Sequence, residues 1–422
     1  MPSLADTLFL TDAQLRSSTL DLAVTPFPPR LRPRARLGVL DITEFYGDTT
    51  GGVRTYLREK AVYVEAHPEV RQTLVLPGAA DAITSSGGVR IYRLRGPLVP
   101  TQEQYRFMLA TRSDRRIMKH EQPDVIEVGS PGFVPWIVRL AARGLDIPVV
   151  AFYHSHFPRL FSPWPERAGV FRRSAHNLAW RYARLIDRHF AHTIVCSRFV
   201  GDDLRRAGID RVSQVPLGVD LERYSPALRA QRDEVRRSHG LPSGPIAGFV
   251  GRFGKEKELD VLVAAWPQVH RKTGAMLVLV GDGPQRAALE AQAGGASWLR
   301  FLPFMRDRDA LASLLAAFDI VVAPGSSETF GLAPLEAIAC GTPVLSADRG
   351  GMSEQIEAAG AGERFLSGNP GSLAESAIRL LESDLATHSR LGRAHAEANN
   401  DWKSVFDRIF AVYTSVAAEA GR

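Results

Sequence analysis

The chain has 422 residues, of which 45% are hydrophobic and 23% charged, so it is a globular chain too long for one ordinary core. The formal net charge of +6, mostly from arginine, favours anionic partners such as nucleotide phosphates or an acidic lipid surface. Apolar runs are shorter than the roughly 20 residues of a membrane span, and acids near the start disfavour a signal peptide.

Cys196 and Cys340 lie in apolar segments, as reduced core residues do, and disfavour a disulfide or metal framework. We therefore expect a cytoplasmic protein, which its charge would allow to lie on the inner face of the cell membrane.

The first 35 residues form an irregular lead-in that ends in a basic, proline-containing stretch at residues 28–36. From residue 37, short apolar runs alternate with helical patterns, for example at residues 52–66 and 133–143. Such alternation indicates βα units and a parallel sheet, here in a first domain at residues 36–216. Its predicted strands are residues 37–42, 73–76, 125–128, 149–153, 193–196 and 212–215.

Turn residues cluster at residues 216–226, and the alternation then restarts in a second domain at residues 217–400. We expect two doubly wound, Rossmann-like α/β domains whose ligands bind at the carboxyl ends of the strands, in the cleft between the domains. A final helix, at about residues 401–422, has an apolar face that must dock on the rest of the chain. The predicted strands of the second domain are residues 246–250, 276–280, 299–303, 320–323 and 343–346.

Two carboxylates, Glu328 and Glu336, enclose the sequence ETFGLAPLE after an apolar strand and a turn of proline, glycine and serine. The pattern predicts a tight turn and a helix that starts near Phe330, Gly331 and Leu332. A helix N-terminus offers free backbone N–H groups and a partial positive charge, so it suits a phosphate. Two acids beside a phosphate site indicate a ligand that also carries hydroxyls, as a nucleotide-sugar does.

The first strand of the second domain ends in GRFGKEK, which places Arg252 and Lys257 after Gly251 at the carboxyl end. Two cations there could bind a diphosphate and offset the charge that grows on it as a leaving group. The alternative is a solvated basic loop, because Glu256 and Glu258 lie among the cations.

Weaker signals follow other predicted strands. Gly281 and Gly283, in the turn GDGP, permit positive φ or close backbone approach, although many ordinary βα turns look alike. Backbone groups near Phe304 could face a base edge, or the segment is an ordinary strand end. In the first domain, Gly51 and Gly52 would let N–H groups approach an anion or a sugar, and the alternative is a flexible βα loop.

The predicted strand at residues 149–153 ends in the sequence HSHFPR. A lone histidine is more often a satisfied core group. Two histidines, His154 and His156, followed by Arg159 where an apolar strand stops, favour a site role for His154. Farther along, Asp202 and Asp203 lack the pattern of a metal site and are interpreted as first-turn acids that complement a helix dipole.

The segment from Arg167 to Phe190 is rich in arginine and aromatic residues and poor in acids. A helix of this composition could lie on an anionic lipid surface or receive an anionic acceptor. A solvated helix face is an equally good interpretation.

Taken together, ETFGLAPLE, GRFGKEK, PLGVDLERYSP and GTPVLSADRGGMSEQI resemble the retaining, nucleotide-sugar-dependent glycosyltransferases of the "glycosyl transferases group 1" family, which have the GT-B fold. The resemblance covers about residues 36–415, and the order and spacing of its motifs are specific in combination. The stretch AFYHSHFPRL is similar to a segment of the α-mannosyltransferase and sulfolipid-synthase branches.

The resemblance implies a role for each matching residue. Arg252 and Lys257 would hold the diphosphate, Glu328 the hydroxyls of the donor sugar, and Glu336 those of the ribose. His154 would lie near the 6-hydroxyl of the sugar and the reacting face. The other residues implied are Phe330, Gly331 and Leu332 as backbone donors to phosphate and sugar, Gly251, Gly281, Gly283 and Phe304 on the donor side, and Gly51 and Gly52 beside phosphate and acceptor. The last helix would pack back on the first domain.

The implied reaction is transfer of a hexose with retention, from a nucleotide-sugar such as GDP-mannose or a UDP-hexose to a lipid or saccharide hydroxyl. It would need no metal or other cofactor, because Arg252 and Lys257 would take the place of a divalent ion, and no nucleic acid is implied as a partner. The alternatives are a nucleotide-sugar epimerase or a phosphorylase on the same fold, and a non-catalytic nucleotide-sugar-binding protein. A dehydrogenase is disfavoured, because neither domain has G-x-G-x-x-G after its first strand.

Overall fold

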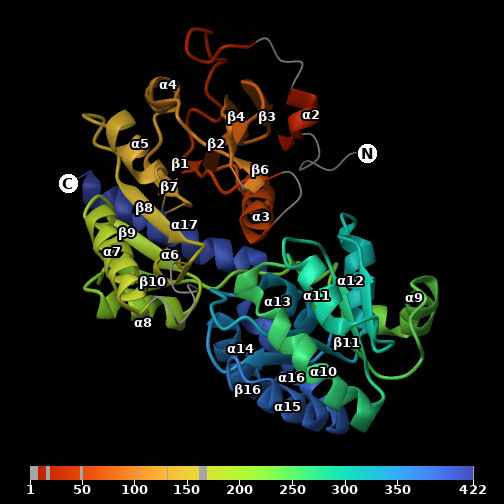
Figure 1. The fold of residues 1–422 in the computed structure, drawn as a ribbon. Helices are drawn as coiled ribbons and strands as arrows, with labels where there is room; N and C mark the ends of the chain where they lie inside the picture. Colours follow the sequence, from red (N-terminus) through yellow and green to blue (C-terminus); the bar gives the residue numbers. More distant parts are fainter. Residues whose placement is uncertain are drawn as a thin grey trace. The chain divides into compact units, whose positions relative to one another are not determined.

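The computed structural model describes residues 8–15, 20–47, 51–100, 102–130, 132–160 and 169–421 (Figure 1). The chain forms two compact units. The first unit comprises Met1–Val195, Gly201–Val215 and Phe406–Arg422, and the second unit comprises Cys196–Val200 and Pro216–Val405. Among the described helices, none is both long and apolar enough to cross a membrane.

Within the described residues of the first unit, eight strands form one sheet in the order β10-β9-β8-β7-β1-β2-β4-β3. Neighbouring strands are parallel except β3 and β4, which form an antiparallel pair at one edge. The strand order reverses between β1 and β7, so the turns after these two strands lie at the topological switch point. The strands are β1 (Leu37–Ile42), β2 (Val70–Gly78), β3 (Ala82–Ser86), β4 (Val89–Arg95), β7 (Val125–Val128), β8 (Val149–Tyr153), β9 (His192–Val195) and β10 (Val212–Gln214), beside a separate hairpin of β5 (Leu98–Val99) and β6 (Gln102–Arg106).

Helices cover this sheet and bury apolar residues of its strands in a common core. The last helix, α17, contributes its residues from Phe406 onward to the first unit. The helices are α2 (Asp12–Leu15), α3 (Gly52–Ala66), α4 (Thr111–Glu121), α5 (Val134–Ala141), α6 (Phe157–Leu160), α7 (Gly169–Asp187), α8 (Arg198–Arg206) and α17 (Trp402–Ala420).

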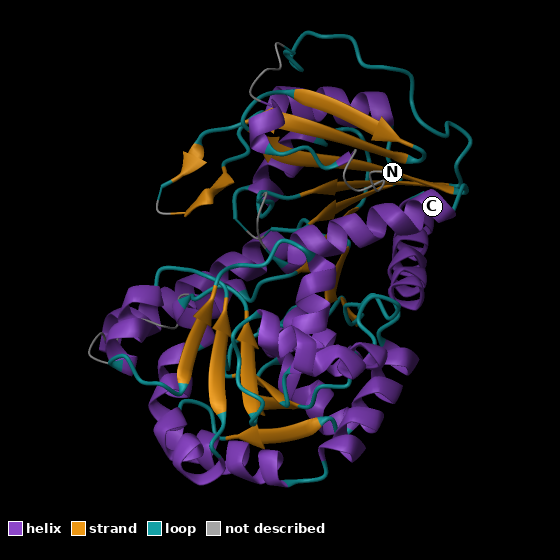
Figure 2. Cartoon of the chain, turned by 90° about the vertical axis from the view of Figure 1, so that its right-hand side faces the viewer, coloured by secondary structure: helices purple, strands orange, loops and turns teal. Residues whose placement is uncertain are grey.

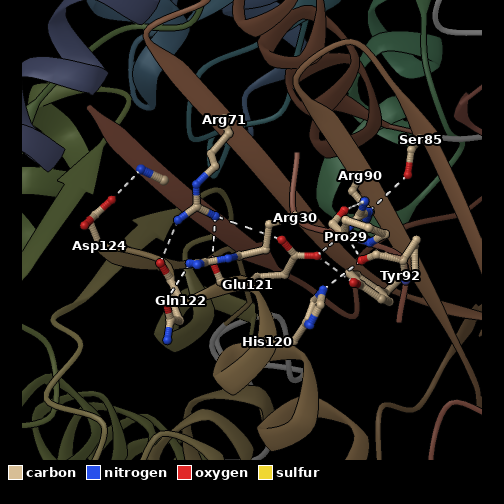
Figure 3. A network of polar contacts seen from close by, with 12 residues as sticks. Pro29, Arg30, Arg71, Ser85, Arg90, Tyr92, His120, Glu121, Gln122 and Asp124 are labelled. Atoms are coloured by element: carbon tan, nitrogen blue, oxygen red, sulfur yellow. Dashed lines mark hydrogen bonds and ion pairs between the residues drawn. The ribbon is translucent and has the colours of Figure 1, made fainter. Parts of the chain in front are cut away.

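A polar network fastens the described end of the lead-in to this sheet (Figure 3). Arg90, on β4, donates to the carbonyl oxygens of Pro28 and Pro29 at 3.2 and 2.6 Å and pairs with Glu121 at 2.7 Å. Tyr92 donates to the same carboxylate at 2.6 Å. Two charged side chains that are nearly buried are therefore satisfied by each other and by the backbone.

The second unit is a sheet of six parallel strands in the order β13-β12-β11-β14-β15-β16, with helices on both sides (Figure 2). Its switch point lies between β11 and β14. The strands are β11 (Ile246–Val250), β12 (Met276–Val280), β13 (Leu299–Leu302), β14 (Ile320–Ala323), β15 (Val344–Ala347) and β16 (Gly362–Phe365). The helices are η2 (Pro226–Gln231), α9 (Arg232–Ser238), η3 (Lys255–Lys257), α10 (Leu259–Thr273), α11 (Arg286–Ala293), α12 (Arg308–Ala317), α13 (Leu332–Ala339), α14 (Gly351–Ala359), α15 (Pro370–Glu382) and α16 (Leu385–Asn399).

The predicted fold class, α/β with two doubly wound parallel sheets, is confirmed. The sequence analysis missed the strands β3 to β6 and β16. Except for the two-residue β5, these strands carry polar and charged residues in place of a short apolar run. In β4, for example, Arg90 and Arg93 are buried and donate to carbonyl oxygens, which hydrophobic patterning does not reveal.

Candidate functional site

The turns after β11 and β14 meet at the switch point of the second unit. Lys257, in η3 after β11, forms an ion pair with the carboxylate of Glu328, in the turn after β14. Their side chains are 26% and 25% exposed, so both remain accessible. The structure therefore brings together two predicted site residues that lie 71 positions apart in the chain.

Electrostatics keep Lys257 charged. Burial lowers the pKa of its ammonium group, but the charge and hydrogen bond of Glu328 outweigh burial, and the net effect raises the pKa. The exposed Arg252 pairs with Glu256 at 2.8 Å. Both cations thus have a carboxylate partner, with which an anionic ligand would have to compete.

Glu258 fastens the two turns to each other. Its backbone is left-handed, with φ of 51°, and its carboxylate accepts hydrogen bonds from the backbone N–H of Ser326, at 3.0 Å, and from the Ser326 hydroxyl. Sequence reasoning gave neither residue a role. The available signal was the acid immediately before the start of α10.

Gly281 and Gly283 allow the turn after β12 to pack on the turn after β11. Gly281 has φ of 136°, and an added Cβ would lie 2.0 Å from the carbonyl oxygen of Gly251. At Gly283, with φ of 155°, the added Cβ would lie 2.7 Å from the backbone nitrogen of Phe253. The predicted positive φ is present, and the close approach that it permits is between the two turns.

The segment between the two carboxylates forms the predicted turn and helix start. Phe330 is buried, Gly331 has φ of 93° at the N-cap, and α13 begins at Leu332. The turn after β15 supports this segment, because the N–H of Gly351 donates to the carbonyl oxygen of Glu328 at 2.8 Å. Sequence reasoning assigned no role to Gly350 and Gly351, where an added Cβ would meet the Glu328 and Thr329 carbonyl oxygens.

Glu336 lies in a different environment from Glu328. It is nearly buried within α13 and close to Tyr224. Burial, followed by the charge of Glu336, raises the pKa of the Tyr224 phenol. The two carboxylates therefore differ in exposure and in partners, which does not suit a proton-sharing pair.

Phe304 follows β13, and its ring is 48% exposed. Large apolar side chains are normally covered, so an open aromatic face at a strand end is available to stack on a ligand ring.

In the first unit, His154 follows β8 and packs between aromatic rings. Its ring centroid lies 4.1 Å from that of Phe152 and 4.9 Å from that of Tyr56. An added Cβ at Gly129, after β7, would contact the His154 ring at 3.5 Å. Burial, with a smaller effect of Lys60, lowers the pKa of His154 to about 3, so the imidazole is neutral at physiological pH.

His156 is a buried structural residue. Its Nε2 lies 2.9 Å from Oδ2 of Asp203, which also accepts from Nε of Arg159 at 2.8 Å. The sequence interpretation of Asp202 and Asp203 as first-turn acids is wrong, because α8 begins at Arg198 and has no acid in its first turn. Asp203 instead binds the buried His156 and the half-buried cation of Arg159, which compensates the loss of water around its charge.

Gly51 and Gly52 precede and open α3. Both are exposed, Gly51 has φ of 98°, and an added Cβ there would meet no atom within 4 Å. Their backbone is therefore open to a ligand.

Sequence reasoning also missed Glu44, in the turn after β1. Its carboxylate lies against Gly132, where an added Cβ would be 2.3 Å from Oε1, and burial raises its pKa to about 7. The available signal was an acid directly after an apolar strand that ends at the switch point.

A buried charge cluster lies beside His154. Lys60 has no exposed side-chain surface and contacts Asp41 at 2.5 Å, Glu127 at 3.2 Å and the Tyr413 hydroxyl at 2.8 Å. Tyr56, whose ring contacts His154, donates to Glu127 at 2.9 Å. Sequence reasoning did not find this cluster, because its acids stand singly within apolar strands.

The described part of the basic segment lies on α7. Arg181, Arg184 and Arg188 are exposed, and so are Leu178 and Leu185. The side chains of Arg167 and its neighbours up to residue 174 lie outside the described residues. Across the described part of the chain, no group of three or more histidines, cysteines or acids is arranged to hold a metal ion.

The fold matches solved structures over most of the chain. Sucrose-phosphate synthase from Thermosynechococcus elongatus aligns with a TM-score of 0.74 at 20% identity, over 91% of this chain and all of that one. WaaG, a glycosyltransferase involved in lipopolysaccharide biosynthesis, aligns with a TM-score of 0.64 at 18% identity, over 89% and 99% of the two chains. The chain, with its two Rossmann-like domains, thus has the GT-B fold that these solved structures share.

Sequence comparison gives the family. Residues 231–398 match the model described as "Glycosyl transferases group 1", and residues 50–223 match "Glycosyltransferase Family 4". A GDP-mannose-dependent alpha-(1-6)-phosphatidylinositol dimannoside mannosyltransferase of Mycobacterium tuberculosis is 33% identical over 76% of this chain and 82% of its own. The sulfoquinovosyl transferase SQD2 of Arabidopsis thaliana is 31% identical over 68% of this chain, and this chain spans 56% of its length. The chain belongs to the glycosyl transferases group 1 family.

Proposed function

We propose that this chain is a retaining hexosyltransferase that uses a nucleotide-diphosphate sugar and a lipid or saccharide hydroxyl acceptor. The observation that carries the proposal is the Lys257–Glu328 ion pair at the switch point of the second unit. A cation beside a carboxylate that remains partly exposed suits a ligand with adjoining phosphate and hydroxyl groups. GDP-mannose is the donor we favour, because the names of several relatives specify GDP-mannose.

The second unit would hold the donor. Arg252 and Lys257 would bind the diphosphate, Glu328 the hydroxyls of the sugar, and Glu336 those of the ribose. The open ring of Phe304 would lie against the base. The two packed turns that contain Gly251, Gly281 and Gly283 would support the donor, and Phe330, Gly331 and Leu332 would present backbone N–H groups.

In the proposed reaction, the acceptor oxygen attacks the anomeric carbon from the face that the nucleotide leaves. The bond from that carbon to the phosphate oxygen breaks, and the departing diphosphate takes the acceptor proton. Lys257 and Arg252 stabilise the negative charge on the leaving group. His154, which is neutral, would donate or accept a hydrogen bond and carry no charge, while the backbone at Gly51 and Gly52 would approach the acceptor.

Replacement of Lys257 tests the leaving-group role. We expect Lys257→Ala to lower kcat by on the order of 100-fold or more, as removal of one charge-stabilising donor does. Lys255, an exposed lysine in the same 3-10 turn, supplies the matched control Lys255→Ala. Near wild-type turnover of a folded Lys257→Ala protein would refute the role.

Metal independence is also part of the proposal, because Arg252 and Lys257 would neutralise the diphosphate in place of a divalent ion. Transfer should persist when EDTA is present in the assay. Loss of activity in EDTA with rescue by Mn²⁺ would contradict the proposal.

The donor can be found from ligand-induced stability, because a bound ligand raises the unfolding temperature by mass action. We expect GDP to raise it more than UDP or ADP at equal concentration. Incubation with nucleotide-sugars alone separates the transferase from an epimerase, which would convert the donor without an acceptor.

A further inference from the structure

A basic hollow with a volume of about 680 Å³ lies in the first unit. Residues on and next to α6, α7 and α8 line it, and Figure 1 labels these three helices. We call it the arginine pocket. Four arginines and only one acid line it, so an anion is the ligand that its charge favours. The lining residues used below are Arg159, Trp180, Arg181, Arg184, Asp203 and Arg206.

Asp203 holds two of the arginines in place. Its side chain is 5% exposed and accepts from Arg159 Nε at 2.8 Å, while Arg206 Nη2 lies 2.8 Å from its other oxygen. Burial raises the pKa of Asp203, but hydrogen bonds from His156 and Arg159 outweigh burial and lower the pKa to about 2. The carboxylate is therefore charged, paired and covered, and it fixes the two guanidinium groups.

Helix α7 supplies the other two arginines. Arg181 and Arg184 are exposed, and no acidic side chain among the described residues forms an ion pair with either. Trp180 is half-buried beside them, with its Nε1 3.1 Å from Nε2 of His176. Two guanidinium groups without acidic partners form the planar forks that bind a phosphate through paired N–H groups.

The same arginines line a second hollow of about 570 Å³ on the other flank of α7. Leu178 and Leu185 line this hollow too, and they are 66% and 44% exposed. A helix face of exposed leucines and arginines suits the interface of a membrane, where leucine enters the acyl boundary and arginine meets lipid phosphates. The leucines thus favour a lipid over a soluble molecule as the source of the phosphate.

We propose that the arginine pocket binds the headgroup phosphate of an anionic phospholipid, with Arg181 and Arg184 as its principal ligands and α7 lying on the membrane surface. None of these residues is among the proposed donor groups. The inference therefore goes beyond glycosyl transfer and can fail independently of it.

The test is co-sedimentation of the full chain with vesicles. The wild-type protein should bind equimolar phosphatidylcholine and phosphatidylglycerol, and should not bind phosphatidylcholine alone. In Arg181→Gln/Arg184→Gln, binding to the mixed vesicles should weaken by roughly 30-fold, which is the contribution of two basic residues at an anionic surface. The matched control Arg205→Gln/Arg211→Gln removes the same charge from the same unit outside both hollows, and its binding should weaken by much less.

Three outcomes would overturn the inference. Equal weakening in both double variants would show that net charge alone attracts the protein. Equal binding to phosphatidylcholine alone would show that the pocket does not require an anionic phospholipid. Binding of soluble glycerol 3-phosphate that depends on Arg181 and Arg184, without binding to vesicles, would assign the pocket to a soluble ligand. Unchanged stabilisation of the double variants by GDP shows that they are folded and keeps this result separate from the donor site.

Discussion

His154 and Lys257 both lose water on folding, and Lys257 gains the carboxylate of Glu328 in exchange. Burial therefore leaves His154 neutral, whereas Glu328 keeps Lys257 charged. This contrast suits the proposed roles, because a leaving diphosphate needs a cation and an acceptor hydroxyl needs only a hydrogen-bond partner. Asp114 shows the same loss of water with no compensation among the described residues, since both of its carboxylate oxygens are buried without a hydrogen bond.

Asp114 predicts a pH-dependent stability. Burial raises its pKa from 3.8 to about 7, so the folded protein binds this proton more tightly than the unfolded chain does. The contribution of this proton to the free energy of unfolding is fully present below pH 3.8, and it is lost as the pH rises through about 7. We expect Asp114→Asn, which has the same shape and no charge, to raise the free energy of unfolding by a few kcal/mol at pH 8 relative to wild type.

Urea unfolding at pH 5 and pH 8 measures this effect. The difference between Asp114→Asn and wild type should be larger at pH 8. A difference that is the same at both pH values would mean that Asp114 does not titrate on folding in this range.

The turns of the second unit are organised by glycine and by Glu258. Gly281 lets the turn after β12 pack on the carbonyl oxygen of Gly251, and Glu258 binds the turn that carries Glu328. The proposed donor residues therefore lie on a set of mutually packed turns at the ends of rigid strands. A side chain inserted between two of these turns should affect ligand binding as well as stability.

Gly281 and Gly274 both have positive φ, but only Gly281 is packed against another turn. Alanine at each position therefore distinguishes the effect of packing from the effect of backbone strain. Gly281→Ala should lower the free energy of unfolding by several kcal/mol and weaken GDP binding, because its Cβ would lie 2.0 Å from a carbonyl oxygen. Gly274→Ala, with φ of 71° and no atom within 4 Å of the added Cβ, should cost only about 1 kcal/mol and leave GDP binding unchanged. Denaturant unfolding and GDP titration measure the two effects, and similar losses in both variants would contradict the packing argument.

The first unit is assembled from distant parts of the chain. Tyr413, on α17, donates a hydrogen bond to Glu127 and lies 2.8 Å from Lys60, so the last helix completes the buried charge cluster. A buried cation with two carboxylates is tolerated only when each polar group is satisfied. The cluster therefore makes α17 a necessary part of this unit.

Removal of one hydroxyl tests that dependence. Tyr413→Phe keeps the ring and leaves buried polar groups short of a partner, which should lower the free energy of unfolding by about 1–3 kcal/mol. Thr414→Val is a control on the same helix, since the Thr414 hydroxyl only donates to the Phe410 carbonyl at 2.9 Å. If Tyr413→Phe is no less stable than Thr414→Val, the cluster does not depend on the hydroxyl.

The sequence predicted the two parallel sheets well, because buried parallel strands are continuous apolar runs. It also predicted the turn after β14 and the start of α13, where proline, glycine and serine follow such a run. The pairing of Lys257 with Glu328 needed the strand order, which brings β11 beside β14 and which local patterns do not contain.

The buried charges could not be predicted either, because their partners depend on the tertiary fold. Lys60, Arg90 and Asp203 are buried charges that the patterns class as surface residues. Their partners, such as Glu127 and Glu121, come from distant segments, so the compensation for lost water appears only in the folded chain.

The composition of the first unit also has a consequence for biosynthesis. Its final residues, Phe406–Arg422, emerge from the ribosome only after every residue of the second unit. The second unit can therefore complete its fold first, although the first unit begins earlier in the chain. Until Tyr413 is synthesised, Lys60 and Glu127 in the nascent first unit lack this partner, so the buried charge cluster is completed only late in translation.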